Sequence, residues 1–230
     1  MNEIDNIQNI LEEYGVSNFI KIFMYDKLLC LFFGKAGRWY QLHCIINLLI
    51  TIDILPSVIE IIIDPYNGYK LINNNNNNNN NMIVSMHLYH ILMFSGLNIY
   101  DWLHHIVFVG FGVLPGMMYV KSNQLYLHKI ACSGIPGIIE YGTLALYKNN
   151  RLSKINQKYI NTLLYVYFRL PLCILGVTIN YIAYKEELIK DPLWITLYAN
   201  FLLYLNGTFF TLLTVDSYCK VKYLENKKYI

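Results

Sequence analysis

Long apolar stretches set the limits on how this chain folds. Six of them follow one another, and each is close to the roughly 20 residues that an α-helix needs to cross a bilayer. They are Tyr40–Ile63, Met82–Ile99, Trp102–Val120, Gln124–Tyr147, Tyr159–Tyr184 and Pro192–Val215. The chain is 55% hydrophobic and only 14% charged, whereas soluble domains carry about 25% charged residues. The sequence therefore predicts an all-α, polytopic membrane bundle of about six transmembrane helices.

The segments around these stretches divide the chain into three parts. We expect an N-terminal region over 1–37, a transmembrane domain over 38–219 and a basic tail over 220–230. The segment 19–33 is apolar but carries Lys21, Asp26 and Lys27, which favours an interfacial amphipathic helix over a further span. The Asn run of residues 73–81 has low complexity, so a disordered loop is expected there.

Positively charged residues are unevenly distributed among the connections. Most lie before the first stretch, between the fourth and fifth, and after the sixth: Lys21, Lys27, Lys35, Arg38, Lys148, Arg151, Lys154, Lys158, Lys220, Lys222, Lys227 and Lys228. The other connections carry only Lys70, Lys121, Lys185 and Lys190. Because Lys and Arg accumulate in cytosolic loops, both termini are expected in the cytosol, with an even number of spans. The Asn run then faces the lumen or the exterior.

Several function classes are disfavoured by composition. The net charge is only +3 and the basic residues are scattered, so no nucleic-acid partner is expected. The five cysteines show no metal-binding spacing, and we expect neither a metal site, nor a disulfide framework, nor a cofactor. The N-terminus has no basic segment followed by an apolar core, so a cleavable signal peptide is not expected.

Polar residues within the first stretch share one side of the predicted helix. His43, Asn47, Asp53, Ser57 and Glu60 fall within roughly 140° of arc. Ionisable groups are costly in a bilayer and by default face the interior of the bundle. We therefore expect this face to point inward, where Asp53 either belongs to a functional site or only bonds neighbouring helices.

Histidines concentrate in the second and third stretches. His87 and His90 are spaced to share one helix face, and Asp101, His104 and His105 can share another. Asp101 is also well placed to cap the third helix, because Asp commonly precedes the first turn. A His-His pair beside an Asp, with two more histidines on the preceding helix, makes His104 or His105 the candidate functional residue.

Glu140 and Arg169 are predicted to meet within the bilayer. An unpaired Arg at that depth would cost several kcal/mol. At about 1.5 Å per residue, the two side chains lie at similar depths from the cytosolic side, so we expect a salt bridge that is either structural or catalytic. Proline and glycine at residues 134–137 also predict a bend or a close helix contact in the fourth stretch.

The polar groups gather in the cytosolic half of the predicted bundle. A cavity there could admit a lipid from the leaflet and a polar co-substrate from the cytosol. The expected supporting or substrate-binding residues are His87, His90, Asp53, Glu140 and Arg169.

Three segments on successive predicted helices resemble those of TLC-domain proteins, a family that includes ceramide synthases and translocation-associated membrane proteins. They are the Tyr-Asp-Trp-Leu-His-His-Ile-Val sequence of residues 100–107, Ile139–Thr143 around Glu140, and Tyr167–Pro171 around Arg169. The order of these segments matches the family, and the resemblance covers most of the chain.

The resemblance implies a lipid-modifying acyltransferase of an internal membrane such as the endoplasmic reticulum, or of a host membrane if the chain is viral. His104 or His105, with Asp101, would act as the general base in acyl transfer from acyl-CoA. Asp101 lies closer to the histidine pair than in the synthases, and the later acidic residues and the homeobox-like insert are missing. These departures favour the alternative of a non-catalytic lipid-binding, lipid-homeostasis or trafficking protein of the same fold.

Two other classes fit the residues less well. Histidine-rich di-iron hydroxylases and desaturases use about eight histidines, and this chain has six. A channel or transporter would require a repeated pore-lining pattern of charges, which the sequence does not contain.

Overall fold

The structure is a computed structural model that describes residues 15–70, 75–97, 99, 102 and 104–227. These residues form helices and turns, with no strand among them. The helices are α2 (Val16–Phe33), α3 (Arg38–Ile63), α4 (Pro65–Lys70), α5 (Asn75–Met93), η2 (His104–Val113), α7 (Leu114–Tyr119), α8 (Leu125–Cys132), α9 (Ile135–Lys148), α10 (Lys154–Leu164), η3 (Tyr165–Arg169), α11 (Leu170–Lys185) and α12 (Leu193–Asn226). The predicted all-α fold is confirmed.

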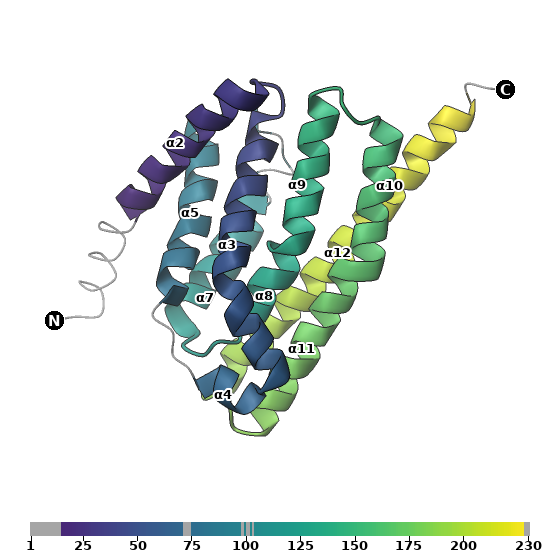
Figure 1. Cartoon of the computed structure of the whole chain (residues 1–230). Helices are drawn as coiled ribbons and strands as arrows, with labels where there is room; N and C mark the ends of the chain where they lie inside the picture. Colours follow the sequence, from purple (N-terminus) through teal and green to yellow (C-terminus); the bar gives the residue numbers. More distant parts are fainter. Residues whose placement is uncertain (1–14, 71–74, 98, 100–101, 103, 228–230) are drawn as a thin grey trace.

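The long helices lie side by side in one bundle (Figure 1). α3 packs along α9, α11 packs along α12, and α10 continues through η3 into α11 as one long element. The turn before α3, the turn between α9 and α10, and the C-terminal end of α12 lie at one end of the bundle, whereas α4 and the turn between α11 and α12 lie at the other (Figure 1). We call these the upper and the lower end.

Three of the described helices are individually long and apolar enough to cross a membrane: Arg38–Ile63, Lys154–Lys185 and Leu193–Asn226. They match the first, fifth and sixth stretches. The helices that cover the second, third and fourth stretches are shorter or interrupted. α5 ends at Met93 rather than near residue 99, the third stretch is divided into η2 and α7, and the fourth into α8 and α9.

The Asn run is largely helical, so the loop expected over 73–81 is wrong for the residues from Asn75 onward, which open α5. Asn79, Asn80 and Asn81 are buried, and the side-chain amide of Asn79 donates a hydrogen bond to Asp53 at 2.6 Å. Asn has a modest helix propensity, but tertiary contacts commonly outweigh propensity. A composition-based reading could not anticipate those contacts.

The break between α8 and α9 confirms the predicted bend. A Cβ atom at Gly134 would lie 2.6 Å from the carbonyl oxygen of Ile130, so the chain turns where only glycine fits. The close helix contact is confirmed as well. A Cβ atom at Gly137 would lie 2.6 Å from the side-chain nitrogen of Asn47, which places α9 tightly against α3.

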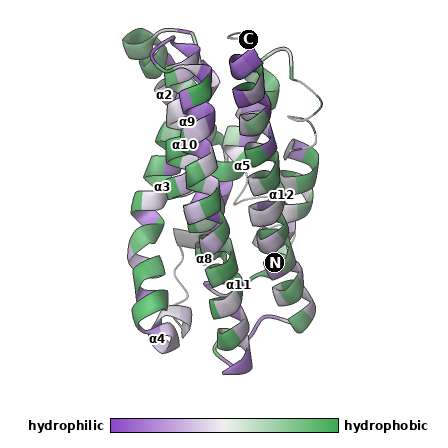
Figure 2. Cartoon of the chain, turned by 90° about the vertical axis from the view of Figure 1, so that its right-hand side faces the viewer, coloured by the Kyte–Doolittle hydropathy of each residue, from purple (hydrophilic) through white to green (hydrophobic). Residues whose placement is uncertain are grey.

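The bundle is largely apolar outside and buries both apolar and polar side chains inside. Many of its large hydrophobic side chains are exposed, including Leu31, Ile63, Leu92, Phe201 and Leu212. Its buried residues include many amides, histidines and charged groups. Figure 2 shows apolar residues along the lengths of the helices and hydrophilic ones at the upper end of α12 and the turn after α11. A surface of this kind suits a hydrocarbon solvent better than water.

Helix α2 also buries a charged group and exposes apolar side chains. It lies obliquely across the upper part of α5 and also packs on α3 (Figure 1). Asp26 is fully buried, where it pairs with Arg38 and accepts a hydrogen bond from the Tyr89 hydroxyl at 2.6 Å. The outward side chains are mainly apolar, although Lys21 and Lys27 are also exposed. A buried ion pair therefore fixes a helix that turns an apolar face outward.

Helix α4 turns back beneath α3 and is held by a chain of buried polar groups. The Tyr69 hydroxyl donates to the Asn180 side chain at 2.5 Å, and Asn180 in turn donates to Asn200 at 3.1 Å. Burial raises the pKa of Tyr69, so its phenol stays protonated and keeps its donor. These bonds join α4, α11 and α12 at the lower end.

Asp191 joins the two lower connections next to α4. Its carboxylate accepts hydrogen bonds from the backbone amides of Lys121 and Ser122 at 2.8 and 3.1 Å, and from the Gln124 side chain at 2.9 Å. Asp191 is buried, so its loss would leave these donors without an acceptor.

We expect Asp191→Ala to destabilise the detergent-solubilised protein by about 2–4 kcal/mol, because hydrogen bonds to a charged group contribute about 1.5–3 kcal/mol each. Chemical denaturation measures the change. The matched control is Glu186→Ala, which removes an exposed carboxylate from the same connection and should have little effect. Equal stability of the two variants would contradict the role given to Asp191.

Candidate functional site

A cavity of about 250 Å³ lies inside the bundle, between α3, α5, η2, α7, α8, α9, η3 and α12. One part of its wall is polar and includes His43, His87, Lys129, Glu140, Tyr165 and Arg169. The rest is largely apolar and includes Ile83, Val109, Val113, Leu202, Leu203 and Phe210. The cavity therefore presents both polar and apolar surfaces to whatever occupies it.

Four histidines form a cluster beside this cavity, and we call His43, His87, His90 and His105 the histidine cluster. They come from α3, α5 and η2. The Nε2 atom of His105 lies 3.1 Å from the Nδ1 atom of His90, so one ring donates a hydrogen bond to the other. The ring centroids of His87 and His105 are 5.1 Å apart, and those of His43 and His87 are 5.7 Å apart.

Aromatic rings hold the two ends of the histidine cluster. Trp39 stacks on His90 with ring centroids 3.5 Å apart, and Tyr141 stacks on His43 at 4.2 Å. Stacking of this kind fixes ring orientation as well as position. His43, His87 and Tyr141 line the cavity directly, so the cluster presents oriented imidazoles to it.

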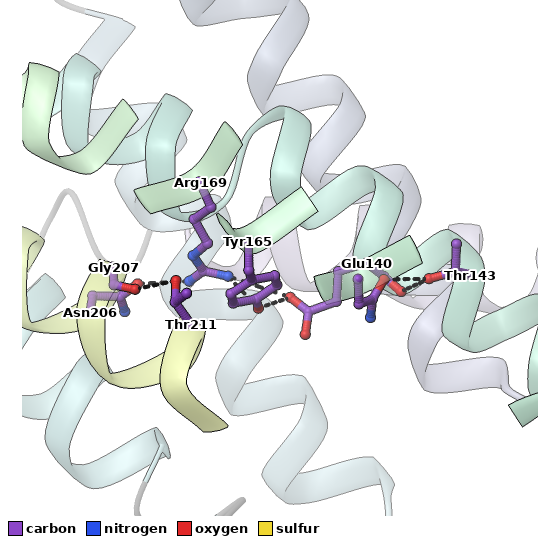
Figure 3. A network of polar contacts seen from close by, with 8 residues as sticks. Glu140, Thr143, Tyr165, Arg169, Asn206, Gly207 and Thr211 are labelled. Carbon is purple, nitrogen blue, oxygen red and sulfur yellow. Dashed lines mark hydrogen bonds and ion pairs between the residues drawn. The ribbon is translucent and has the colours of Figure 1, made fainter. Parts of the chain in front are cut away.

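The charged part of the site is a network across α9, η3 and α12 (Figure 3). Arg169 lies 3.4 Å from Glu140, which confirms the predicted salt bridge. The Tyr165 hydroxyl lies between them: it donates to Glu140 and accepts from Arg169 at 2.5 Å. Arg169 also donates to the Asn206 side chain at 2.7 Å. The buried guanidinium therefore has oriented partners on two sides.

The predicted site residues are only partly brought together. His87, His90 and His105 meet in the histidine cluster, and Glu140 meets Arg169 in the charged network. Asp101 lies outside the described residues, as does the side chain of His104. The predicted pairing of these two with His105 thus stays a prediction.

Asp53 corrects the expectation that the polar face of α3 points inward throughout. His43 and Asn47 are buried at the cavity, but Asp53 is exposed and bonds Asn79 of α5 instead. The expected arc was wide, so residues on its two sides face different neighbours. Asp53 therefore ties α3 to α5 and is absent from the cavity wall.

Several residues of the site were missed from sequence. Tyr165 lies one turn before Arg169, a spacing that would place its hydroxyl near the guanidinium. Asn206 is buried within α12, and nothing in its sequence context indicated a contact with Arg169. Trp39 and Tyr141 carried no signal beyond being aromatic.

The site offers general acid–base groups and an oriented cation. Histidine can take up or release a proton near neutral pH, and buried Arg and Tyr groups can orient a polar headgroup. Among the described residues, no group of three or more His, Cys, Asp or Glu is arranged to hold a metal ion. The rings of the histidine cluster stack and meet edge to face rather than converging on one point.

The charged network predicts that Arg169 and Glu140 contribute to stability as a strongly coupled pair. We expect Arg169→Met to destabilise the protein by about 3 kcal/mol, because it leaves Glu140 without its cationic partner in a partly buried position. Adding Glu140→Gln removes that charge and should recover stability. Denaturation of both variants and of the Glu140→Gln single variant gives the coupling energy, and strictly additive losses would argue against the pair.

Comparison with known proteins gives no relative for this chain: no family model, no curated protein and no solved structure matches it. The resemblance to TLC-domain proteins therefore rests on its motif residues alone.

Proposed function

We propose that the chain is a six-pass membrane protein that binds a membrane lipid in its central cavity. The observation that carries the proposal is the cavity itself, which is lined by both ionisable groups and apolar side chains. A lipid has the same two parts, a polar headgroup and an apolar chain. The apolar outer surface and the three long helices support placement in a bilayer.

The six passes include the interrupted elements. α5 runs beside α2 and α3, and α8 continues into α9 along α3 (Figure 1). We assign the upper end to the cytosol, because it carries Lys35, Lys148, Arg151 and Lys220. Both termini of the bundle would then be cytosolic. The endoplasmic reticulum or another internal membrane, or a host membrane for a viral protein, is the proposed location.

Acyl transfer is the sharper form of this proposal, supported by the similarity of residues 100–107 to the TLC-domain motif. A histidine would take the proton from an amine or hydroxyl as that group attacks the thioester carbon of acyl-CoA. The carbon–sulfur bond then breaks and CoA leaves as a thiolate, which takes up a proton. His105, bonded to His90, and His87, which lines the cavity, are the candidate bases among the described side chains.

The alternative is a lipid-binding or trafficking protein without turnover. The same cavity would serve it, and the histidine cluster would then only orient a headgroup. The two forms differ in a single outcome, which is whether a new lipid is made.

Lipid binding predicts that purified protein carries a lipid. Val109 is buried at the cavity and Ile106, on the same helix, is exposed. We expect Val109→Trp to lower the amount of co-purified lipid roughly tenfold, because the indole ring competes for the cavity and overpacking costs about 1–3 kcal/mol. Ile106→Trp should retain it. Mass spectrometry of extracted lipids measures both, and a wild-type protein without lipid would sink the proposal.

Acyl transfer predicts turnover of labelled acyl-CoA. His87→Gln and His105→Gln should each lower product formation about 100-fold, the usual contribution of a general base or its support. Leu88→Phe, at an exposed position beside His87, is the control for a disturbed α5. Unchanged products in both histidine variants would refute the catalytic form, and lipid binding without any product would favour the alternative.

A further inference from the structure

One wall of the cavity lies where α12 faces η2 and α7. We call this the seam, made of Trp194, Tyr198 and Leu202 on one side and Phe111, Gly112 and Tyr119 on the other. The three α12 residues are spaced four apart, so they form one stripe along the helix. The stripe continues to Asn206, which bonds Arg169 at the cavity.

Three features among the described side chains characterise the seam. At its lower end, the rings of Tyr119 and Trp194 meet edge to face with centroids 5.4 Å apart. Above them, the Tyr198 hydroxyl donates to the carbonyl oxygen of Phe111 at 2.5 Å. Higher still, a Cβ atom at Gly112 would lie 3.8 Å from the Leu202 side chain, so the side chain missing at Gly112 leaves room there.

The seam touches both the cavity and the membrane-facing surface. Tyr198, Gly112 and Leu202 line the cavity, whereas Phe111 is 60% exposed. A layer about one side chain thick therefore separates the two. Elsewhere in the bundle α3 packs along α9 and α11 packs along α12, whereas α12 and η2 make few close backbone contacts among the described residues.

The backbone of η2 also differs from its neighbours. Residues His104–Val113 form a π-helix, a form that is rare over this length and often occurs at functional sites. Gly110 and Gly112 lie within it and carry no side chain to fix it against α12. One wall of the seam is therefore intrinsically easier to displace than a regular helix.

We propose that the seam is the route by which the acyl chain of a membrane lipid enters the cavity from the bilayer. This inference rests on the proposed lipid binding. The surroundings fit an acyl chain, because the exposed residues beside the seam are apolar, among them Ile106, Leu114, Leu197 and Phe201. The six seam residues carry no charge, so an ion or a water-soluble metabolite would find no counter-charge there. Tyr198, with its hydrogen bond to Phe111, and Leu202 are the side chains that an entering acyl chain would displace.

A photoreactive lipid tests this route directly. The full-length protein is placed in nanodiscs with phosphatidylcholine that carries a diazirine in its acyl chain, and the labelled residues are identified by mass spectrometry after brief illumination. Ala199 and Leu203 face the cavity, while Phe201 and Leu205 face outward on the same helix. Labelling of the first pair reports entry, and labelling of the second pair is the internal control for contact with lipid.

Two substitutions move entry in opposite directions. Tyr198→Phe removes the hydrogen bond to Phe111 and should speed inner labelling roughly fivefold, the equivalent of one net hydrogen bond. Gly112→Trp should reduce inner labelling about tenfold by filling the seam. Outer labelling should stay the same in both variants.

The outcomes separate the route from the function. Inner labelling that neither substitution changes would overturn the seam as the entrance, while lipid binding would stand. Wild-type protein that shows outer labelling only, and that co-purifies with no lipid, would overturn the proposed function itself. Opposite shifts at constant outer labelling are the result we expect.

Discussion

The cost of leaving a polar group unpaired in apolar surroundings governs this structure. In the proposed bilayer setting no water satisfies a polar group in the hydrocarbon core, and many of the polar groups turn inward to partners there. Asp26 is buried against Arg38, Arg169 is held by Glu140, Tyr165 and Asn206, and the histidines meet one another edge to face. The interior that results combines an apolar core with buried polar groups around a cavity, and the exterior is largely apolar. The site and the fold therefore have the same physical origin.

The same cost explains which features could be predicted from sequence. An arginine in the middle of an apolar stretch requires a partner, and Glu140 was identifiable because its depth matched. The histidines could be expected to meet because His87 and His90 share a helix face and His105 lies on the following element. The bend at Gly134 followed from glycine and proline chemistry. Each of these features follows from the spacing of residues along the chain, or from an energetic cost so large that only one arrangement avoids it.

Other features depend on packing that spacing does not determine. The helical Asn run requires the buried contacts of Asn79 to Asn81, which composition does not reveal. Asp53 lies outside the cavity because of how far α3 is rotated relative to α5. Tyr165 joins the network because its ring is oriented toward Glu140 and Arg169. Its position one turn before Arg169 does not single it out in the sequence, because the chain contains many tyrosines. The interruption of the third stretch by a π-helix had no sequence signal that we could identify.

Lipid occupancy of the cavity is the claim on which the functional proposals rest. Electron cryomicroscopy of the protein in nanodiscs, with a bound antibody fragment to add mass, tests it most directly. We expect elongated density between η2 and α12, with its polar end near His43, His87 and Glu140 and its tail along Val109 and Leu202. A cavity that holds only ordered water, or that is closed by its own side chains, would contradict a lipid-binding function.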